Sequence, residues 1–425
     1  MKKFVIAGLL FLMIRPVDAQ TDSLSLMECL SAARQYAAIN NQRDVYAEIA
    51  KLKISNANAT YFPGVSAYGK AWYQSDAVTI MGQNGPVLEV DPFQYNAGIE
   101  ADQKLYDGGL AHRQKVLEQA NLEAQYGKIE TQLYQLNSVV TDLYFNSVLL
   151  EKNLEILQLK ASLLDKRLKE MESSFTNGVI KRNDLEKMNS EKLLTQQQVL
   201  EIERQRQQII ASLAGYTGLD IDSETYFVLN ESPLLASDAE RPEYGYYDAE
   251  VRKLESMAHL QKAKNMPFLA AYGQAGYSYP GLNFYANEPD YYYIVGVKLS
   301  WTLFDWKQNK RETQALLKQK EIIETNRTDF KRNVSVLLQQ KLIEQQKLLA
   351  IIEMDGKLVE QLSAVSRGSE TALQNGVITS TEYLEDLNTE IKARLDLEKH
   401  KIELQQSEAQ YRFLEGVDPV SFSAY

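Results

Sequence analysis

The sequence predicts a mainly α-helical chain that also contributes strands to a membrane β-barrel. Three observations lead to this fold class: an internal duplication, strand segments with one apolar and one polar face, and heptad repeats in very long helices. The expected architecture has two structural repeats and four strands per chain, which form a 12-stranded barrel in a trimer, together with a long coiled-coil α-barrel.

The two halves of the chain carry the same landmarks in the same order, about 200 residues apart. Such self-similarity is the signature of a repeated structural unit. Each copy reads as helix, proline, strand, loop, strand, long helix, Asn-Gly turn and returning helix. The paired segments are Ala59–Gly69 with Ala263–Gly273, Leu105–Asp107 with Leu303–Asp305, and Asn177–Ile180 with Asn375–Ile378.

Composition argues against several classes of function. The net charge of −11 disfavours a nucleic-acid partner, because phosphate binding needs clustered Lys and Arg. The single cysteine, Cys29, cannot form an internal disulfide, and its helical setting predicts a buried, inert thiol. The three histidines, His112, His259 and His400, lack metal-ligand spacing. With no recognisable nucleophile–base pair or phosphate loop, we expect no enzyme activity, cofactor or metal site.

The first residues resemble a secretory signal peptide. Lysines precede an apolar run from Phe4 to Ile14, and residues 17–19 fit a small-x-small cleavage site. No cysteine follows this run, so we do not expect a lipid-anchored N-terminus. No later stretch reaches the roughly 18 apolar residues that suggest a membrane helix. We therefore expect an exported chain that is either soluble or a barrel-type membrane protein.

Four segments alternate between apolar and polar residues with the period of a strand. From Phe93 to Leu105 one face is apolar apart from Gln103, and the other is polar or glycine. The two segments that follow Pro63 and Pro267 agree with each other in phase. The partner segment of the second copy has its apolar positions at Tyr291, Tyr293, Val295, Val297, Leu299, Trp301 and Leu303.

Two features favour a membrane barrel over a soluble sandwich, which would also alternate. Aromatic residues gather at both strand ends, as in the girdles at the two membrane interfaces. Each segment has about 10–13 residues, enough to cross tilted hydrocarbon at roughly 3.3 Å per residue. Four strands cannot close a barrel, and open edges are not tolerated in lipid, so the chain must assemble. A dimer would have a filled interior, whereas a trimer leaves room for the lumen that the polar faces favour.

The remaining segments predict helices too long for a globular domain. Over more than fifty residues up to Phe175, apolar residues follow spacings of four and three, broken only by Ser147. This pattern indicates a left-handed coiled coil. A proline-free helix from about Gly109 would span roughly 100 Å. The second copy, from about Trp306 to Leu373, has a looser heptad. Each long helix ends at Asn-Gly, a favourable left-handed cap, and the chain returns as an antiparallel helix.

Four groups of residues, in their order along the chain, carry a family resemblance. They are Leu24–Leu30, Tyr61–Pro63, Leu105–Gly109 and the two Asn-Gly-Val-Ile turns. Together they resemble the TolC family of outer-membrane efflux proteins over nearly the whole mature chain. The resemblance implies a homotrimer in the cell outer membrane with a tunnel that extends into the periplasm. It also implies docking to a periplasmic adaptor (a membrane fusion protein) and to an inner-membrane pump of the RND or ABC type.

The expected division of the chain follows the two repeats. Its parts are the signal peptide (1–19), periplasmic helices of repeat 1 (20–62), barrel strands 1 and 2 (63–107) with an outer loop (76–91), the first long helical hairpin (108–214), an equatorial connection (215–242), the helix of repeat 2 (243–266), barrel strands 3 and 4 (267–305) with an outer loop (280–290), the second long helical hairpin (306–416) and a C-terminal tail (417–425).

The resemblance also assigns a role to the two Asn-Gly turns. They match the tips that contact the adaptor in this family, while a plain helix–helix turn is the structural interpretation that applies in any case. The residues expected to contact the adaptor are Asn177, Gly178, Val179, Ile180, Asn375, Gly376, Val377 and Ile378.

Acidic residues just after the turns are expected to line the pore constriction. In the resemblance, Glu382 and Glu385 match the acidic ring at the closed aperture, and Asp184 matches the acidic position of the first turn. Helix capping is the alternative: Thr379 and Glu382 fit a capping box, and Asp184 lies in a first helical turn. Counted from the Asn-Gly pairs, Asp184 aligns with Glu382. The two residues after Asp184, Leu185 and Glu186, align better with Leu384 and Glu385, and that alignment needs one extra residue in the second copy.

The predicted function is a trimeric outer-membrane exit duct for efflux or secretion. Its periplasmic tip would be gated by inter-helix polar contacts, and an inner-membrane transporter would drive export through the adaptor. The alternative is a non-conducting, membrane-anchored coiled-coil stalk, which a conductance measurement separates from a duct. A third class, the periplasmic adaptor itself, would need a lipoyl-like all-β segment that we do not find in the sequence.

Overall fold

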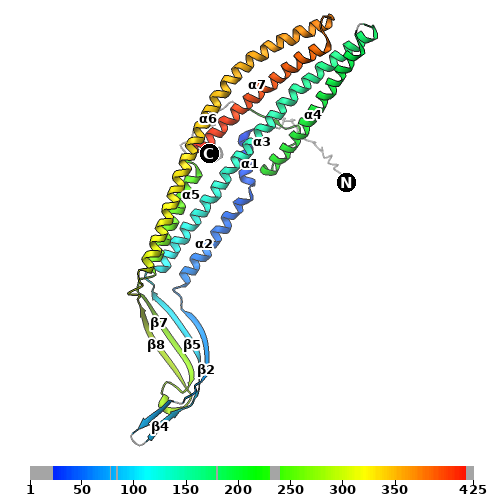
Figure 1. The fold of residues 1–425 in the computed structure, drawn as a ribbon. Coiled ribbons are helices and arrows are strands. Elements are labelled where there is room, and N and C mark those ends of the chain that lie inside the picture. The colour runs from blue at the N-terminus through cyan, green and yellow to red at the C-terminus, as the bar shows by residue number, and fades with distance from the viewer. Residues whose placement is uncertain (1–22, 77, 83–84, 179, 230–239, 418–425) are drawn as a thin grey trace, which may run out of the picture. The chain divides into compact units, whose positions relative to one another are not determined.

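The computed structural model describes residues 23–76, 78–82, 85–178, 180–229 and 240–417 (Figure 1). They form two compact units. The sheet unit comprises Ala38–Tyr134 and Glu240–Val336, and the tip unit comprises the described parts of Met1–Ala37, Gln135–Ala239 and Leu337–Tyr425. Each unit draws on both copies of the duplication, so the two copies are not two separate domains.

The sheet unit contains one four-stranded antiparallel sheet (Figure 1). Its strands are β2 (Gly64–Tyr73), β5 (Phe93–Tyr106), β7 (Phe268–Tyr279) and β8 (Asp290–Ser300), in the order β2-β5-β7-β8. The pairing of β5 with β7 joins the two copies. Within the described residues, β2 and β8 pair on one side only. The four predicted strands therefore form one sheet with two open edges.

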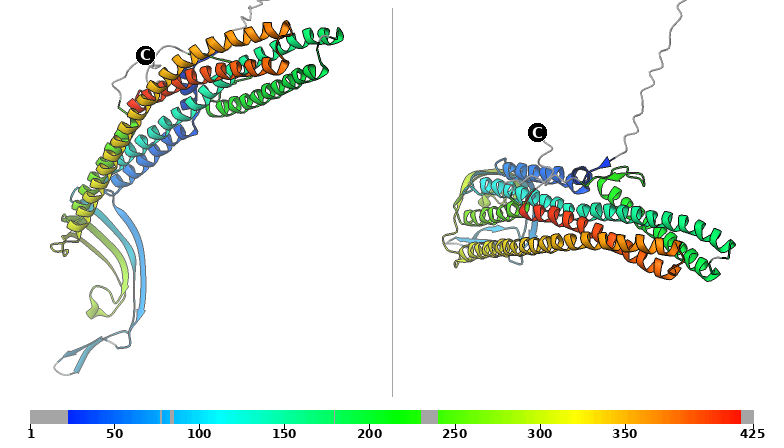
Figure 2. Two further views of the ribbon diagram at one scale, coloured as in Figure 1. Left: turned by 45° about the horizontal axis from the view of Figure 1, so that its top comes forward. Right: turned by 90° about the horizontal axis from the view of Figure 1, so that it is seen from above.

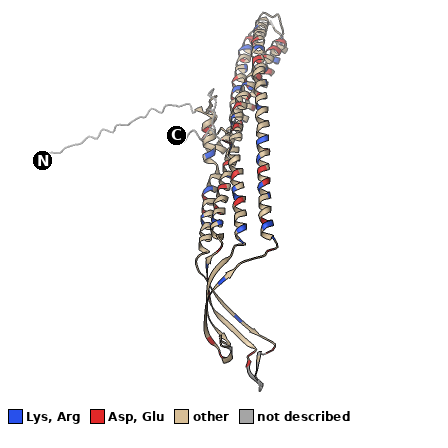
Figure 3. Ribbon diagram, turned by 90° about the vertical axis from the view of Figure 1, so that its left-hand side faces the viewer, with Lys and Arg blue, Asp and Glu red and all other residues tan. Residues whose placement is uncertain are grey.

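The predicted alternation of faces is present in this sheet. Alternate apolar residues of β8 are at least 70% exposed, whereas the intervening Tyr292 is 8% exposed. Charged residues are rare on the strands and frequent on the helices (Figure 3). The strand ends at Ser300, earlier than predicted, because its partner β7 begins at Phe268, directly after Pro267, which has no N–H to donate. The exposed residues of β8 are Tyr291, Tyr293, Val295, Val297 and Leu299.

The segment predicted as an outer loop, residues 76–91, contains a β-hairpin. β3 (Val78–Gly82) pairs antiparallel with β4 (Gly85–Val90). The β7–β8 connection holds a 3-10 turn, Phe284–Ala286, and the side chain of Asn287 donates to the carbonyl of Glu89 at 3.2 Å. The Gly and Pro of the segment indicated a loop, but the hairpin forms because pairing satisfies the backbone groups of both strands.

Four helices complete the sheet unit. A 3-10 turn, Ala38–Asn40, and α2 (Asn41–Ala59) precede β2, and α5 (Pro242–Ala263) precedes β7. The long helices α3 (Leu110–Thr176) and α6 (Gln308–Gln374) follow β5 and β8 and continue into the tip unit. Each has 67 residues, close to the proline-free helices predicted from about Gly109 to Phe175 and from about Trp306 to Leu373.

Ion pairs connect these helices within the sheet unit. They join α2 to α3, α5 to α3, and α5 to α6, so α3 has a partner helix from each copy. The pairs are Lys53–Glu118, Arg252–Glu123 and Lys320–Glu255, with N···O distances of 3.1, 3.2 and 2.6 Å.

Asp107 caps α3 and ties it to the segment before β2. Its carboxylate accepts hydrogen bonds from the N–H groups of Gly109 and Ala111, at 2.9 and 2.7 Å, and from the hydroxyl of Tyr61, at 2.9 Å. Burial would raise the pKa of Asp107, but the hydrogen bonds outweigh it and hold this pKa below its ordinary value.

Asp305 repeats this arrangement at the start of α6. It accepts from the side chain of Asn265 at 2.7 Å and from the N–H of Asn309 at 2.9 Å, and these bonds lower the pKa of Asp305. Pro63 and Pro267 lie between the tied segments and their strands. Proline therefore marks the change from helix to strand in both copies, as the sequence predicted.

The turn between strand and long helix uses different residues in the two copies. Gly108 and Gly109 have φ angles of 68° and 81°, and Trp306 and Lys307 have 53° and 63°. This left-handed region suits glycine, whereas it costs other residues roughly 1–2 kcal/mol each. A Cβ on Gly108 would collide with the Cβ of Met266, while the Trp306 side chain is 78% exposed. The first copy therefore needs glycine where the second accommodates an aromatic residue.

In the tip unit each long helix returns through a shorter antiparallel helix (Figure 2). α4 (Arg182–Thr217) follows α3, and α7 (Ser380–Glu415) follows α6. The predicted heptad face of α3 supplies buried residues, among them Val140 and Leu164, which have no exposed surface. Its polar break, Ser147, is also buried and donates to the carbonyl of Leu143 at 3.0 Å, so the hydroxyl is satisfied within the helix.

Short elements from three parts of the chain complete the tip unit. α1 (Leu26–Tyr36) carries Cys29, which is fully buried as predicted, and desolvation raises the pKa of its thiol to about 12. β1 (Ser23–Leu24) pairs in parallel with β6 (Tyr226–Phe227). The hydroxyl of Tyr144 reaches the carbonyl oxygen of Leu24 at 3.0 Å. In the described ranges, no helix is both long and apolar enough to span a membrane.

Candidate functional site

The two helical hairpins turn at equivalent Asn-Gly pairs. Gly178 and Gly376 have φ angles of 76° and 70°, the left-handed conformation that ends a helix. At the second turn, the N–H of Gly376 donates to the carbonyl of Leu373 at 3.0 Å, and the N–H of Val377 donates to that of Ala372 at 2.8 Å. This double pattern satisfies two of the last carbonyls of α6 and confirms the predicted left-handed cap.

The asparagines of the turns support their own hairpins. The side-chain amide of Asn177 donates to the carbonyl of Ser173 at 2.9 Å, and that of Asn375 donates to the carbonyl of Thr371 at 3.0 Å. Both side chains therefore have a structural role in the single chain, whatever else they contact.

The other residues predicted to contact an adaptor differ in exposure. Val377 is 74% exposed at the second turn, whereas Ile180 and Ile378 are half-buried and pack against the hydrophobic cluster behind the turns. Val179 lies outside the described residues. The described surface of the turns therefore consists mainly of the Asn-Gly pairs and Val377.

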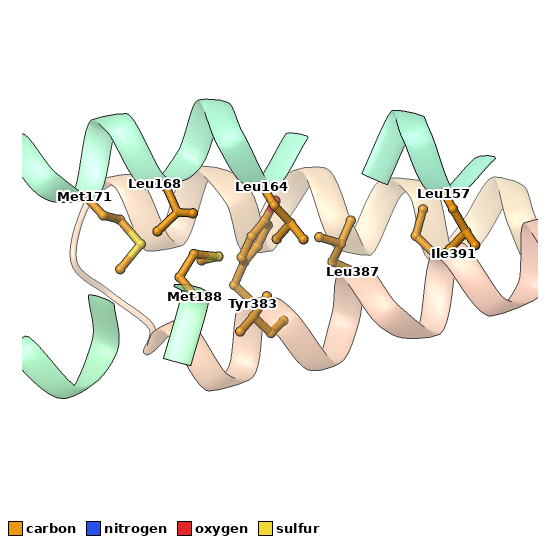
Figure 4. Close-up of a cluster of buried hydrophobic side chains, with 9 residues drawn as sticks. Leu157, Leu164, Leu168, Met171, Met188, Tyr383, Leu387 and Ile391 are labelled. Carbon is orange, nitrogen blue, oxygen red and sulfur yellow. The ribbon is translucent and has the colours of Figure 1, made fainter. Parts of the chain in front are cut away.

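The cluster behind the turns joins the two hairpins (Figure 4). Leu164 of α3 and Met188 of α4 have no exposed surface, and Leu387 of α7 has 2%. Full burial of a side chain of this kind contributes about 1.5–3 kcal/mol, so the cluster holds the hairpins together. Its buried residues are Leu157, Leu164, Leu168, Met171, Met188, Tyr383, Leu384, Leu387 and Ile391.

A buried arginine links the hairpins beside this cluster. The Arg167 side chain on α3 is 4% exposed, and its guanidinium pairs with Glu370 of α6 and with Glu170 of its own helix. It also lies over the ring of Tyr383 on α7, 5.7 Å from the centroid. This link could not be predicted, because its only sequence signal is a basic residue directly before a heptad leucine, Leu168.

Glu382 serves as a helix cap at the start of α7. Its carboxylate accepts from the N–H and the hydroxyl of Thr379 at 2.7 and 2.9 Å, and its own N–H donates to that hydroxyl at 3.4 Å. These bonds complete the predicted capping box. The hydrogen bond from the Thr379 backbone, followed by that from its hydroxyl, lowers the pKa of Glu382, so the carboxylate is ionised near neutral pH.

Of the predicted constriction residues, Glu382 and Glu385 are exposed and Asp184 is half-buried. Glu382 and Glu385 lie on an exposed face of α7, and the two residues between them are buried in the cluster. Asp184 is the third residue of α4, as Glu382 is of α7, so the structure aligns these two without an extra residue. Lys187 of α4 donates to the hydroxyl of Thr381 at 2.6 Å, which places the starts of the two helices side by side.

Comparison with known proteins agrees with this architecture. Residues 238–417 match the sequence model of the family described as outer membrane efflux protein. No curated protein sequence matches the chain. The CmeC outer membrane channel of Campylobacter jejuni has a similar structure, with 13% identity over 94% of this chain and 88% of that one, and a TM-score of 0.66.

Two further outer-membrane proteins have similar structures. VceC of Vibrio cholerae is 13% identical over 92% of this chain and 96% of its own, with a TM-score of 0.66. The MtrE outer membrane channel of Neisseria gonorrhoeae, solved in its open state, is 14% identical over 92% of this chain and 89% of its own, with a TM-score of 0.64.

The sequence of residues 238–417 and the fold of the chain thus resemble the same class of protein, the outer membrane efflux proteins. The chain carries the sequence signature of the outer membrane efflux proteins over residues 238–417, and the predicted resemblance to the TolC family is confirmed. The same matches agree with the predicted outer-membrane location.

Proposed function

We propose that three copies of the chain close into an outer-membrane exit duct for efflux or secretion. The observation that carries this proposal is the sheet, which has two open edges, an exposed apolar face and a polar face. Open edges are not tolerated in lipid, so β2 of one copy pairs with β8 of the next. Three sheets then give a twelve-stranded barrel whose apolar face meets lipid and whose polar face lines the lumen.

Aromatic contacts at both ends of the strands support this orientation. The rings of Tyr277 and Tyr291 contact each other near one end, with centroids 4.8 Å apart, and the centroids of Tyr95 and Tyr279 lie 5.9 Å apart. Past the other end, Phe304 contacts Trp306 at 4.7 Å. Tyr and Trp gather at membrane interfaces because their rings are apolar and their polar groups reach water.

The helices of the sheet unit also offer a surface for a neighbouring copy. On α2, Val45, Ile49 and Leu52 are 56%, 40% and 59% exposed at spacings of four and three residues. An apolar stripe with this spacing fits the seam of a coiled coil. In the trimer it packs on a helix of the next copy and continues the wall of the duct beyond the barrel.

The tip unit supplies the gate of the proposed duct. The link from Arg167 to Glu370 holds the two hairpins of a chain together in the resting state. A periplasmic adaptor docks at the Asn-Gly turns, where Val377 is exposed, and the inner-membrane pump behind it is of the RND or ABC type. The adaptor opens the tip only if it binds the open state more tightly than the closed state. MtrE, which shares the fold, is described in an open state.

The acidic residues of the tip set the ion preference of the duct. Glu382 and Glu385 of three copies, with Asp184 beside them, bring like charges close at the constriction and favour cations. In planar bilayers, Glu382→Gln with Glu385→Gln is expected to reduce the ratio of cation to anion permeability. Gln keeps most of the side-chain shape, so the change reports mainly on charge.

A matched variant on the same hairpin controls for the loss of a carboxylate. Glu353 on α6 is exposed and paired with Lys357, and Glu353→Gln is expected to leave the permeability ratio unchanged. An unchanged ratio in the Glu382/Glu385 variant would reject the pore-lining assignment. Absence of any conductance in the wild-type protein would reject the duct and favour the non-conducting stalk.

A further inference from the structure

Three tyrosines on the polar face of the sheet each lie against a glycine of the neighbouring strand. Tyr68, Gly98, Gly276 and Tyr292 form one row across all four strands, with the tyrosines on the two edge strands. A Cβ on Gly98 would lie 2.7 Å from the Tyr68 hydroxyl, and one on Gly276 would lie 3.1 Å from the Tyr292 ring. The two tyrosine side chains therefore extend toward each other along the row, over the glycines.

A third tyrosine–glycine pair has the same arrangement on the two strands β7 and β8. Tyr272 of β7 is opposite Gly296 of β8. A Cβ on Gly296 would lie 2.7 Å from the hydroxyl of Tyr272 and 2.8–2.9 Å from its ring carbons, with no backbone atom among its nearest neighbours. The ring of Tyr272 occupies the space that a side chain at position 296 would fill.

A chain of hydrogen bonds holds the first row in place. The amide of Gln274 donates to the hydroxyl of Tyr68 at 2.7 Å. The hydroxyl of Tyr292 lies 2.5 Å from that of Tyr68, and it donates to the side-chain oxygen of Asn96 at 2.8 Å. Because Tyr292 gives its one proton to Asn96, Tyr68 is the donor between the two hydroxyls. Each of the four strands thus contributes one member to the chain.

We propose that these tyrosine–glycine pairs are positioning elements that hold the tyrosine rings flat against the wall of the duct and keep its lumen clear. The inference rests on the proposed function, in which the polar face lines the lumen. In a trimer, three rings from each copy are folded back in this way. If a side chain replaced the glycine hydrogen and displaced the ring, the ring would turn into the lumen and obstruct the flow of ions.

The pair of Tyr272 and Gly296 provides the cleanest test, because only side-chain atoms stand in the way of a new Cβ. We expect Gly296→Ala to lower the single-channel conductance in planar bilayers. The double variant Gly296→Ala with Tyr272→Ala removes the displaced ring and is expected to return the conductance to at least the wild-type value. Gly273→Ala is the matched control, since a Cβ at Gly273 on β7 meets open space.

Assembly is followed in parallel, as the yield of folded oligomer in detergent. A loss of conductance per assembled channel in Gly296→Ala that the second substitution restores supports the inference, whereas a loss of assembly with normal conductance of the channels that do form overturns it. Wild-type behaviour of Gly296→Ala, or a loss that Tyr272→Ala does not restore, overturns it while the duct itself stands. If the wild-type protein does not conduct, the proposed function fails, and this inference fails with it.

Discussion

Replacing Gly108 with alanine is expected to destabilise the folded chain by ~2–5 kcal/mol. Two costs add at this position. The φ angle of 68° is unfavourable for any residue with a Cβ, and the new Cβ would collide with the Cβ of Met266. Neither atom is at the end of a flexible side chain, so relief requires a shift of the backbone where β5 passes into α3.

The neighbouring glycine is the matched control. Gly109 has a similar φ of 81°, but the nearest atom to a Cβ there is Nε of Arg113, at 3.9 Å. Gly109→Ala is therefore expected to cost only the backbone term of roughly 1–2 kcal/mol. Thermal unfolding in detergent, followed by helical circular dichroism, measures both variants. Equal midpoints for the two would contradict the packing argument.

Glu370→Gln is expected to open the resting tip. The substitution removes the negative charge that pairs with Arg167 across the hairpins and leaves the buried guanidinium with Glu170 as its one carboxylate partner. A hydrogen bond to a charged group contributes about 1.5–3 kcal/mol, which corresponds to a roughly ten- to hundredfold shift from closed to open if the link exists only in the closed state. The measurement is the open probability of single channels without an adaptor.

A second glutamate on α6 provides the control for this prediction. Glu353 pairs with Lys357 one turn away, and both side chains are at least 70% exposed. Exposed pairs of this kind contribute little, so Glu353→Gln is expected to leave the open probability unchanged. If Glu370→Gln also behaves like the wild type, the Arg167 link has a structural role and the gate lies elsewhere.

Much of the fold could be predicted because the duplication shows each element twice. The proline-free stretch and its heptad spacing predicted a helix from about Gly109 to Phe175, and α3 spans Leu110–Thr176. The phase of alternation identified which side of β8 would be exposed, Tyr291 and Tyr293 included. The β3–β4 hairpin could not be predicted, because Gly and Pro residues in this segment are typical of loops. The segment forms strands only because β3 and β4 pair with each other.

The candidate site could be predicted in part, for a related reason. Local signals are sufficient for the capping box of Thr379 and Glu382 and for the left-handed glycines of the turns. Contacts between segments far apart in sequence leave no such signal: Arg167 and Glu370 are separated by 203 residues, and Tyr68 and Tyr292 by 224. Whether a polar residue is buried or exposed in these places depends on the packing of other elements.

The mass of the detergent-solubilised mature protein tests the central claim most directly. If the free edges of β2 and β8 pair between copies, light scattering or native mass spectrometry will find particles of three chains, each donating one four-stranded sheet to a closed cylinder. A stable single chain or a pair of chains would contradict this closure, because neither can join the open edges around a lumen.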